Sequence, residues 1–113
     1  MNIQEIASRA EEAAGFLKSI ANPCRLVLLC ELSKGERAVG DLEAVAGLSQ
    51  SAVSQHLARL REAGLVTTRR QAQTVFYSLQ SEGVRQVIDV LDELYCRPVD
   101  EEKRRVSCRS TVP

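Results

Sequence analysis

The fold is decided by residues 48–64, whose sequence is LSQSAVSQHLARLREAG. Both ends of this stretch predict the limits of a helix. Ser49 is a good N-cap, because its hydroxyl can accept a hydrogen bond from an N–H group of the first turn. Gly64 suits the C-terminal end, because it enters the left-handed conformation without strain. Apolar residues at i, i+4 and i+7 form a narrow stripe along this helix: Val53, Leu57 and Leu60.

The opposite face of the helix is polar and cationic. It carries Ser51, Gln55 and Arg59, and such side chains hydrogen-bond to base edges and phosphates. A solvated surface helix would show the same pattern in isolation. The neighbouring elements therefore have to distinguish a DNA-reading helix from an ordinary surface helix.

Periodicity and capping residues predict elements on both sides of this stretch. Asn22-Pro23 begins a helix, because Asn caps well and Pro suits the first helical position. Gly47 makes a tight turn into residues 48–64, which is typical of a helix-turn-helix. Gly15 interrupts the first helix, where we expect a close approach to another helix. The predicted helices cover residues 3–20, 23–34, 39–46 and 82–96, and the predicted hairpin strands cover 65–70 and 74–79.

This order of elements predicts a mainly α (α+β) fold, the winged helix-turn-helix. We expect one domain over residues 1–96 and a flexible, charged tail over residues 97–113. The first and last helices are amphipathic and have little else to pack on. A homodimer through these two helices would cover them and would place two reading helices about one DNA turn apart, as an inverted repeat requires.

Charge is balanced over the whole chain but not along it. The sequence has 15 Lys and Arg residues against 15 Asp and Glu residues, so nucleic-acid binding would depend on a local patch. Residues 49–80 supply one, with four arginines against a single Glu62: Arg59, Arg61, Arg69 and Arg70. The sequence shows no signal peptide and no membrane-length apolar run, so we expect a cytoplasmic protein. It also shows no nucleophile–base constellation, so an enzyme is the least favoured class.

Four segments carry a resemblance to a known family: residues 16–26, 39–42, 48–60 and 69–77. They are similar to the ArsR/SmtB family of bacterial repressors, and within it to a subgroup that contains thiol-responsive regulators. The resemblance spans about residues 10–96. It implies a homodimer that binds double-stranded operator DNA containing an inverted repeat.

On this interpretation the helix within residues 48–64 enters the major groove and the hairpin forms the wing. Ser51, Gln55 and Arg59 would face the bases. His56 lies about 60° from the apolar stripe, so we expect it to pack or to contact phosphate. The complete expected set is Gln50, Ser51, Ser54, Gln55, His56 and Arg59 in the helix, and Arg69, Arg70 and Gln73 in the wing.

The resemblance also implies a role for two cysteines. Cys30 and Cys96 match the positions at which thiol-responsive members carry one cysteine on the second helix and its partner at the end of the last helix. Reactive sulfur species or oxidants would link the two and bias the dimer toward a spacing that fits DNA poorly. Cys30 alone could be a small buried hydrophobe. We expect Cys24 to be a partly exposed bystander, and Cys108 lies in the predicted tail.

The metal positions of the family lack suitable ligands here. Residues 36–43 contain no thiol, and no histidine accompanies Asp89 and Asp92 on the last helix. We therefore expect no metal site and no cofactor. Three alternatives stay open: an arsenite- or metal-responsive repressor that uses cysteine thiolates, a regulator with no thiol inducer, and a winged helix that binds only protein. The cluster of arginine and glutamine argues against the last.

Overall fold

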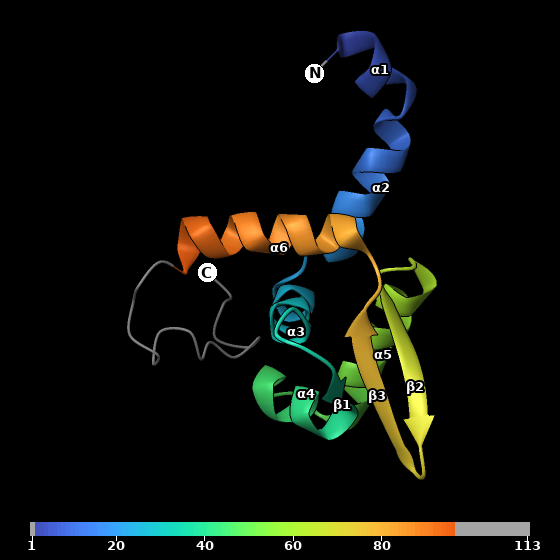
Figure 1. Cartoon of the computed structure of the whole chain (residues 1–113), viewed down its shortest axis with the longest axis vertical. Coiled ribbons are helices and arrows are strands. Elements are labelled where there is room, and N and C mark those ends of the chain that lie inside the picture. Colours follow the sequence, from blue (N-terminus) through green and yellow to red (C-terminus); the bar gives the residue numbers. More distant parts are fainter. Residues whose placement is uncertain (1, 97–113) are drawn as a thin grey trace.

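The computed structural model describes residues 2–96 and confirms the winged helix-turn-helix (Figure 1). The predicted tail, residues 97–113, lies outside the described residues. The elements are α1 (Ile3–Ser8), α2 (Ala10–Ile20), α3 (Pro23–Leu32), β1 (Arg37–Ala38), α4 (Val39–Ala46), α5 (Gln50–Glu62), β2 (Val66–Gln71), β3 (Thr74–Leu79) and α6 (Glu82–Tyr95).

The first predicted helix is two helices, and the break is at Arg9 rather than at Gly15. Arg9 has φ −122° and ψ 18°, outside the helical region, and its N–H donates to Ile6 O at 3.1 Å. Arg9 also serves as the N-cap of α2 and forms an ion pair with Glu12 at 2.9 Å. A Cβ atom at Gly15 would meet nothing within 4 Å, so the expected close approach of another helix at Gly15 is wrong.

A short strand, β1, was not predicted. It joins the hairpin to make a three-stranded sheet in the order β1-β3-β2, with Arg37 opposite Tyr77 and Ala38 opposite Phe76. Two residues are too few to show the alternation of a strand, and this strand exists only because β3 offers it a free edge. Ala38 is also the N-cap of α4, so the sheet leads directly into the helix-turn-helix.

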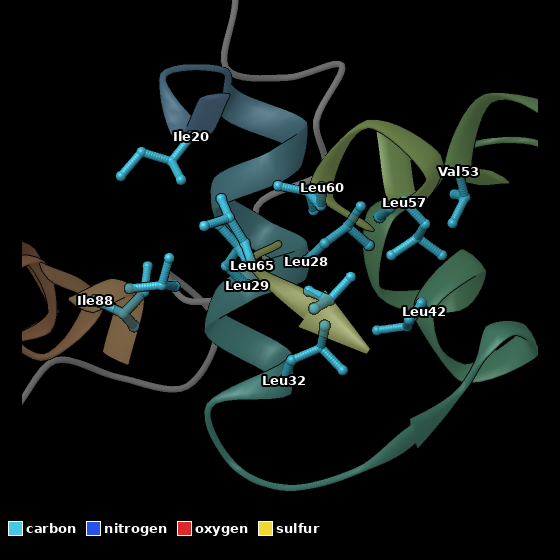
Figure 2. Packing of buried hydrophobic residues seen from close by; sticks show 13 residues of the cluster. Ile20, Leu28, Leu29, Leu32, Leu42, Val53, Leu57, Leu60, Leu65 and Ile88 are labelled. Carbon is cyan, nitrogen blue, oxygen red and sulfur yellow. The ribbon is translucent and has the colours of Figure 1, made fainter. Parts of the chain in front are cut away.

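The core surrounds α3, which contacts α4, α5, α6 and β3. Leu28, Leu29 and Leu32 of α3 are at most 1% exposed. Figure 2 shows Leu57 of α5 approaching α3 from one side and Ile88 of α6 from the other. Burying a leucine side chain of this kind stabilises the fold by roughly 1.5–3 kcal/mol. These contacts fix the position of α5.

The outer helices leave apolar side chains uncovered. On α1 and α2 these are Ile3, Ile6 and Leu17, and on α6 they are Val90, Leu94 and Tyr95. In Figure 1, α6 and the α1–α2 pair both project from the body of the domain. Within residues 2–96, no single helix is long and apolar enough to cross a membrane; α2 and α3 reach that limit only together, with a bend of 87° between them.

Candidate nucleic-acid interface

The turn between α4 and α5 is built by backbone conformation and capping. Gly47 ends α4 in the left-handed region, with φ 68°, where a side chain would cost energy. Ser49 then caps α5, and its hydroxyl accepts from Ala52 N–H at 3.2 Å. The stripe of Val53, Leu57 and Leu60 is fully buried. The helix is therefore held by one face, as the sequence predicted.

The opposite face of α5 is open to solvent. Between the start of α5 and Arg59, the exposed residues are Gln50, Ser51, Ser54, Gln55, Ala58 and Arg59. Five of these six are in the predicted DNA-binding set, and their amide, hydroxyl and guanidinium groups can donate to base edges or phosphate oxygens. The structure thus brings the predicted reading residues together on one uncovered surface.

His56 lies to the side of this surface and is half-buried. Its Nδ1 accepts a hydrogen bond from Arg25 Nε at 3.3 Å, and Arg25 Nη1 donates to Ser19 O at 3.2 Å. Because a guanidinium can only donate, Nδ1 has no proton and the neutral imidazole carries its proton on Nε2. Burial, followed by the charges of Arg25 and Arg59, lowers the pKa of His56 below 6.5. His56 therefore joins α5 to the start of α3.

The wing presents its two arginines on opposite faces. Arg69 lies opposite Phe76 and Arg70 opposite Val75 in the β2–β3 register, and neighbouring residues of a strand point to opposite faces. Gln73 is exposed in the connecting turn. Arg69 forms a two-point ion pair with Glu36, with its closest N–O distance 2.7 Å. In residues 2–96, Arg70 forms no ion pair.

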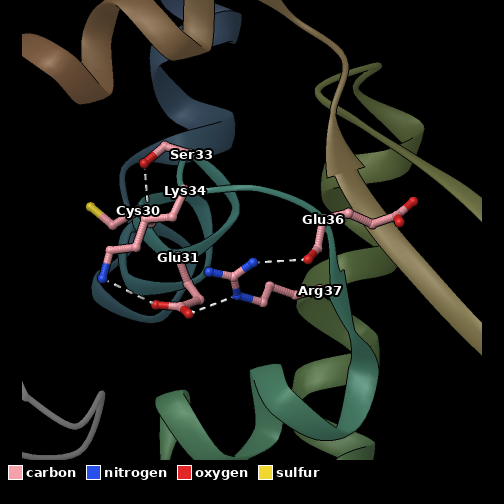
Figure 3. Close-up of polar contacts among 6 residues, drawn as sticks. All are labelled: Cys30, Glu31, Ser33, Lys34, Glu36 and Arg37. Atoms are coloured by element: carbon pink, nitrogen blue, oxygen red, sulfur yellow. Dashed lines mark hydrogen bonds and ion pairs between the residues drawn. The ribbon is translucent and has the colours of Figure 1, made fainter.

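Uncommitted positive charge is concentrated around α5 and the wing. Four of the described cations are in ion pairs: Arg9, Lys34, Arg37 and Arg69. Figure 3 shows two of these pairs, in which Lys34 and Arg37 both reach Glu31. Three exposed arginines form no ion pair with any described residue: Arg59, Arg61 and Arg70. An anionic partner would meet these three at little cost in broken contacts.

The two predicted switch cysteines belong to neighbouring helices. Cys30 is half-buried on α3, and Cys96 is half-buried at the C-cap of α6. The pKa of the Cys30 thiol is raised to about 11, first because burial disfavours the thiolate and then because Cys96 and Asp92 add negative charge nearby. Glu31 acts in the same direction, and only Lys34 opposes it. Cys96 is thus within electrostatic reach of Cys30.

The other cysteines are placed differently. Cys24 is half-buried near the start of α3, where its N–H donates to the Asn22 cap at 2.9 Å. Cys108 lies outside the described residues. No three His, Cys, Asp or Glu side chains in residues 2–96 gather in a way that could hold a metal ion.

An exposed polar helix, a buried stripe behind it and an adjacent arginine-bearing hairpin define a winged helix-turn-helix DNA-binding protein. Comparison with known proteins agrees. The model of the bacterial regulatory protein, arsR family, matches residues 22–68. The transcriptional activator HlyU of Vibrio cholerae is 50% identical over 97 residues, which cover 86% of this chain and 90% of HlyU. The nodulation protein NolR of Rhizobium meliloti is 52% identical over 96 residues, covering 83% and 79% of the two chains.

Solved structures of related regulators have the same fold as this chain. The transcriptional repressor BigR of Xylella fastidiosa superposes with a TM-score of 0.80 at 40% identity, over 85% of this chain and 98% of BigR. The chain belongs to the ArsR family of bacterial regulatory proteins. It is a DNA-binding transcriptional regulator and not an enzyme.

Sequence reasoning missed three residues that shape this surface. Arg25 supports His56, Glu36 engages Arg69, and Phe76 lies beneath the Arg69 guanidinium, 4.7 Å from its centre. Each contact joins residues that are far apart along the chain or on paired strands. Periodicity within one element carries no signal for such pairs.

Proposed function

We propose that this regulator is a cytoplasmic homodimer that represses transcription by binding an inverted-repeat operator. The observation that carries this proposal is the exposed face of α5, which lies beside arginines of the helix and the wing that form no ion pair within residues 2–96. Ser51, Gln55 and Arg59 read base edges, with Gln50 and Ser54 at the border of the groove. From the wing, Arg70 and Gln73 contact the DNA backbone.

The uncovered apolar side chains support the dimer. Leu94 and Tyr95 of α6 are 64% and 76% exposed, and Leu17 of α2 is 54% exposed. A second copy packed on these helices would remove the apolar surface from water and would duplicate α5 on the same side. Leu94→Glu should therefore shift the mass measured by sedimentation from dimer to monomer. Val45→Glu, at an exposed apolar residue of α4, serves as the control and should leave the dimer intact.

The inducer is a reactive sulfur species or another disulfide-forming oxidant. The raised pKa of Cys30 keeps it a protonated thiol at neutral pH, so the Cys96 sulfur starts the reaction. As a thiolate it attacks one sulfur of a polysulfide or small disulfide, and the other sulfur leaves with the electron pair. Cys30 then loses its proton and attacks the Cys96 sulfur, which releases the second thiolate. One S–S bond is reduced to two thiols, and Cys30 and Cys96 become a disulfide.

Linking α3 to the end of α6 would change the angle of the dimerisation helix and so the spacing of the two α5 helices. A coupling of about 1–3 kcal/mol between thiol state and DNA binding would give a useful induction ratio. Because the proposed binding includes contacts with DNA phosphates, we expect the affinity for DNA to fall steeply as the salt concentration rises.

The test is a gel shift with duplex DNA that the reduced protein selects from a randomised pool. Polysulfide should weaken binding by the wild type, and Cys30→Ser or Cys96→Ser should abolish that response. Cys24→Ser, a half-buried thiol on the same helix, is the matched control and should respond like the wild type. If both switch variants also respond, the switch is wrong. If arsenite or zinc releases DNA instead, the metal-responsive alternative holds.

A further inference from the structure

Arg69 is held on three sides by its own protein. Its Nε and Nη2 donate to the two carboxylate oxygens of Glu36 at 2.7 and 2.8 Å, and Nη1 donates to Gln71 Oε1 at 2.9 Å. The plane of the guanidinium lies over Phe76, with its carbon 4.7 Å from the ring centre. A two-point pair with a carboxylate fixes a guanidinium in orientation as well as in position. Stacking on an aromatic ring adds to this restraint.

These contacts cross the whole sheet. Arg69 of β2 lies opposite Phe76 of β3, which in turn lies opposite Ala38 of β1. Residues directly opposite each other share a face of the sheet, and Glu36 precedes Ala38 by two residues, so it extends the same face. In Figure 3 the Glu36 side chain points away from Arg37 and across β3. The ion pair therefore joins the two outer edges of the sheet over its middle strand.

The edge that carries Glu36 is continuous with the helix-turn-helix. β1 passes directly into α4, whose N-cap is Ala38, and α4 packs against α5. A restraint between Glu36 and Arg69 thus fixes the outer strand of the wing relative to the helix that reads DNA. Hydrogen bonding from Arg69 also lowers the pKa of Glu36 below its ordinary value, because the guanidinium favours the ionised carboxylate.

We propose that Glu36 and Arg69 form a clamp that positions the wing, and that Arg70 alone supplies the phosphate contact of strand β2. The inference rests on the proposed DNA binding. Glu36 accepts hydrogen bonds from Nε and Nη2 of Arg69, the donors that would otherwise bind a phosphate. Arg70, on the opposite face, has no such partner among the described residues. Two adjacent arginines therefore have different tasks: one fixes the wing and the other meets the DNA.

The salt dependence of binding separates these tasks. Each phosphate contact contributes about 0.9 to the slope of log K against log salt, which is roughly a 3.5-fold change between 50 and 200 mM. Fluorescence anisotropy with the selected duplex should show that Arg70→Gln lowers the slope by about 0.9. Arg69→Gln should weaken binding severalfold, by the same factor at every salt concentration. Glu36→Gln should also weaken binding, although it removes a negative charge near the DNA.

Two results would overturn the clamp: a loss of slope in Arg69→Gln equal to that in Arg70→Gln, or tighter binding by Glu36→Gln. If the wild-type protein binds no duplex, the proposed function has failed, and the clamp is tested without DNA. Hydrogen exchange of the β2 and β3 amides should then be faster in Glu36→Gln than in the wild type. Unchanged exchange would refute the clamp, and Glu43→Gln on α4 is the matched control for loss of one carboxylate.

Discussion

The Cys30 thiol should react slowly with disulfide reagents as long as the protein is folded. The measurement needs a chain in which Cys30 is the only thiol, obtained with Cys24→Ser, Cys96→Ser and Cys108→Ser. Removing Cys96 takes away one cause of the raised pKa of Cys30, but burial, which is the largest cause, remains. The negative charge of Asp92 remains as well.

The size of the effect follows from the pKa. At pH 7 a pKa of about 11 leaves roughly one thiol in 10,000 ionised, whereas the ordinary value of 9.0 leaves roughly one in 100. A more basic thiolate is also a better nucleophile, so for that difference in pKa the thiolate of Cys30 reacts about eightfold faster than an ordinary cysteine thiolate. Because the variant lacks the Cys96 contribution, its net rate should be lower than that of an ordinary cysteine by up to about tenfold, before any steric shielding by the fold.

Ellman's reagent measures this rate directly, with the same variant unfolded in guanidinium chloride as the reference. The folded protein should react up to about tenfold more slowly at pH 7, and its rate should still rise with pH above pH 9. The reaction rate of the unfolded chain should instead approach a plateau above pH 9. Equal rates, or equal pH profiles, would refute the argument that burial and nearby negative charge hold Cys30 in the thiol form.

Four further changes test the fold and the interface. Leu57→Ala should lower the free energy of unfolding by about 2–5 kcal/mol in urea titration, because its side chain is fully buried; Gln55→Ala, on the exposed face of the same helix, should change it by less than about 0.5 kcal/mol but should weaken DNA binding. His56 has a pKa below 6.5, so the unfolded chain binds more protons, and the free energy of unfolding should fall as pH drops from 6.5 through the folded pKa; His56→Gln should remove that dependence. Ala72→Gly should raise the melting temperature, because Ala72 has φ 57° and a non-glycine residue there costs about 1–2 kcal/mol.

The following results would contradict these predictions. A loss of stability in Gln55→Ala equal to that in Leu57→Ala would mean that the outer face of α5 is packed. An unfolding free energy that rises as the solution is acidified would mean that His56 gains charge on folding. A lower melting temperature for Ala72→Gly would show that chain entropy outweighs the strain in the turn.

Much of the fold could be predicted because its signals are local. Capping by Ser49 and Asn22 and the stripe of Val53 and Leu57 each depend on residues within one turn or two of a helix. The break at Arg9 could not be predicted, since no helix-breaking residue stands there and Gly15 offered a stronger signal. β1 could not be predicted either, because a two-residue strand has meaning only when a partner strand lies beside it.

Local signals along the chain were enough to predict the order of the elements, the buried face of α5 and the polar residues opposite it, because hydrophobic periodicity and caps act over a few residues. The contacts of the charged residues depend instead on how the elements pack in three dimensions. Arg69 and Arg70 are adjacent and chemically identical, yet Glu36 engages one and no described residue pairs with the other. Likewise, the pKa of Cys30 is raised first by burial in the folded domain and then by Cys96 and Asp92 at the end of α6. Electrostatic partners are chosen by distance in space, which the fold sets and the spacing of residues along the chain does not.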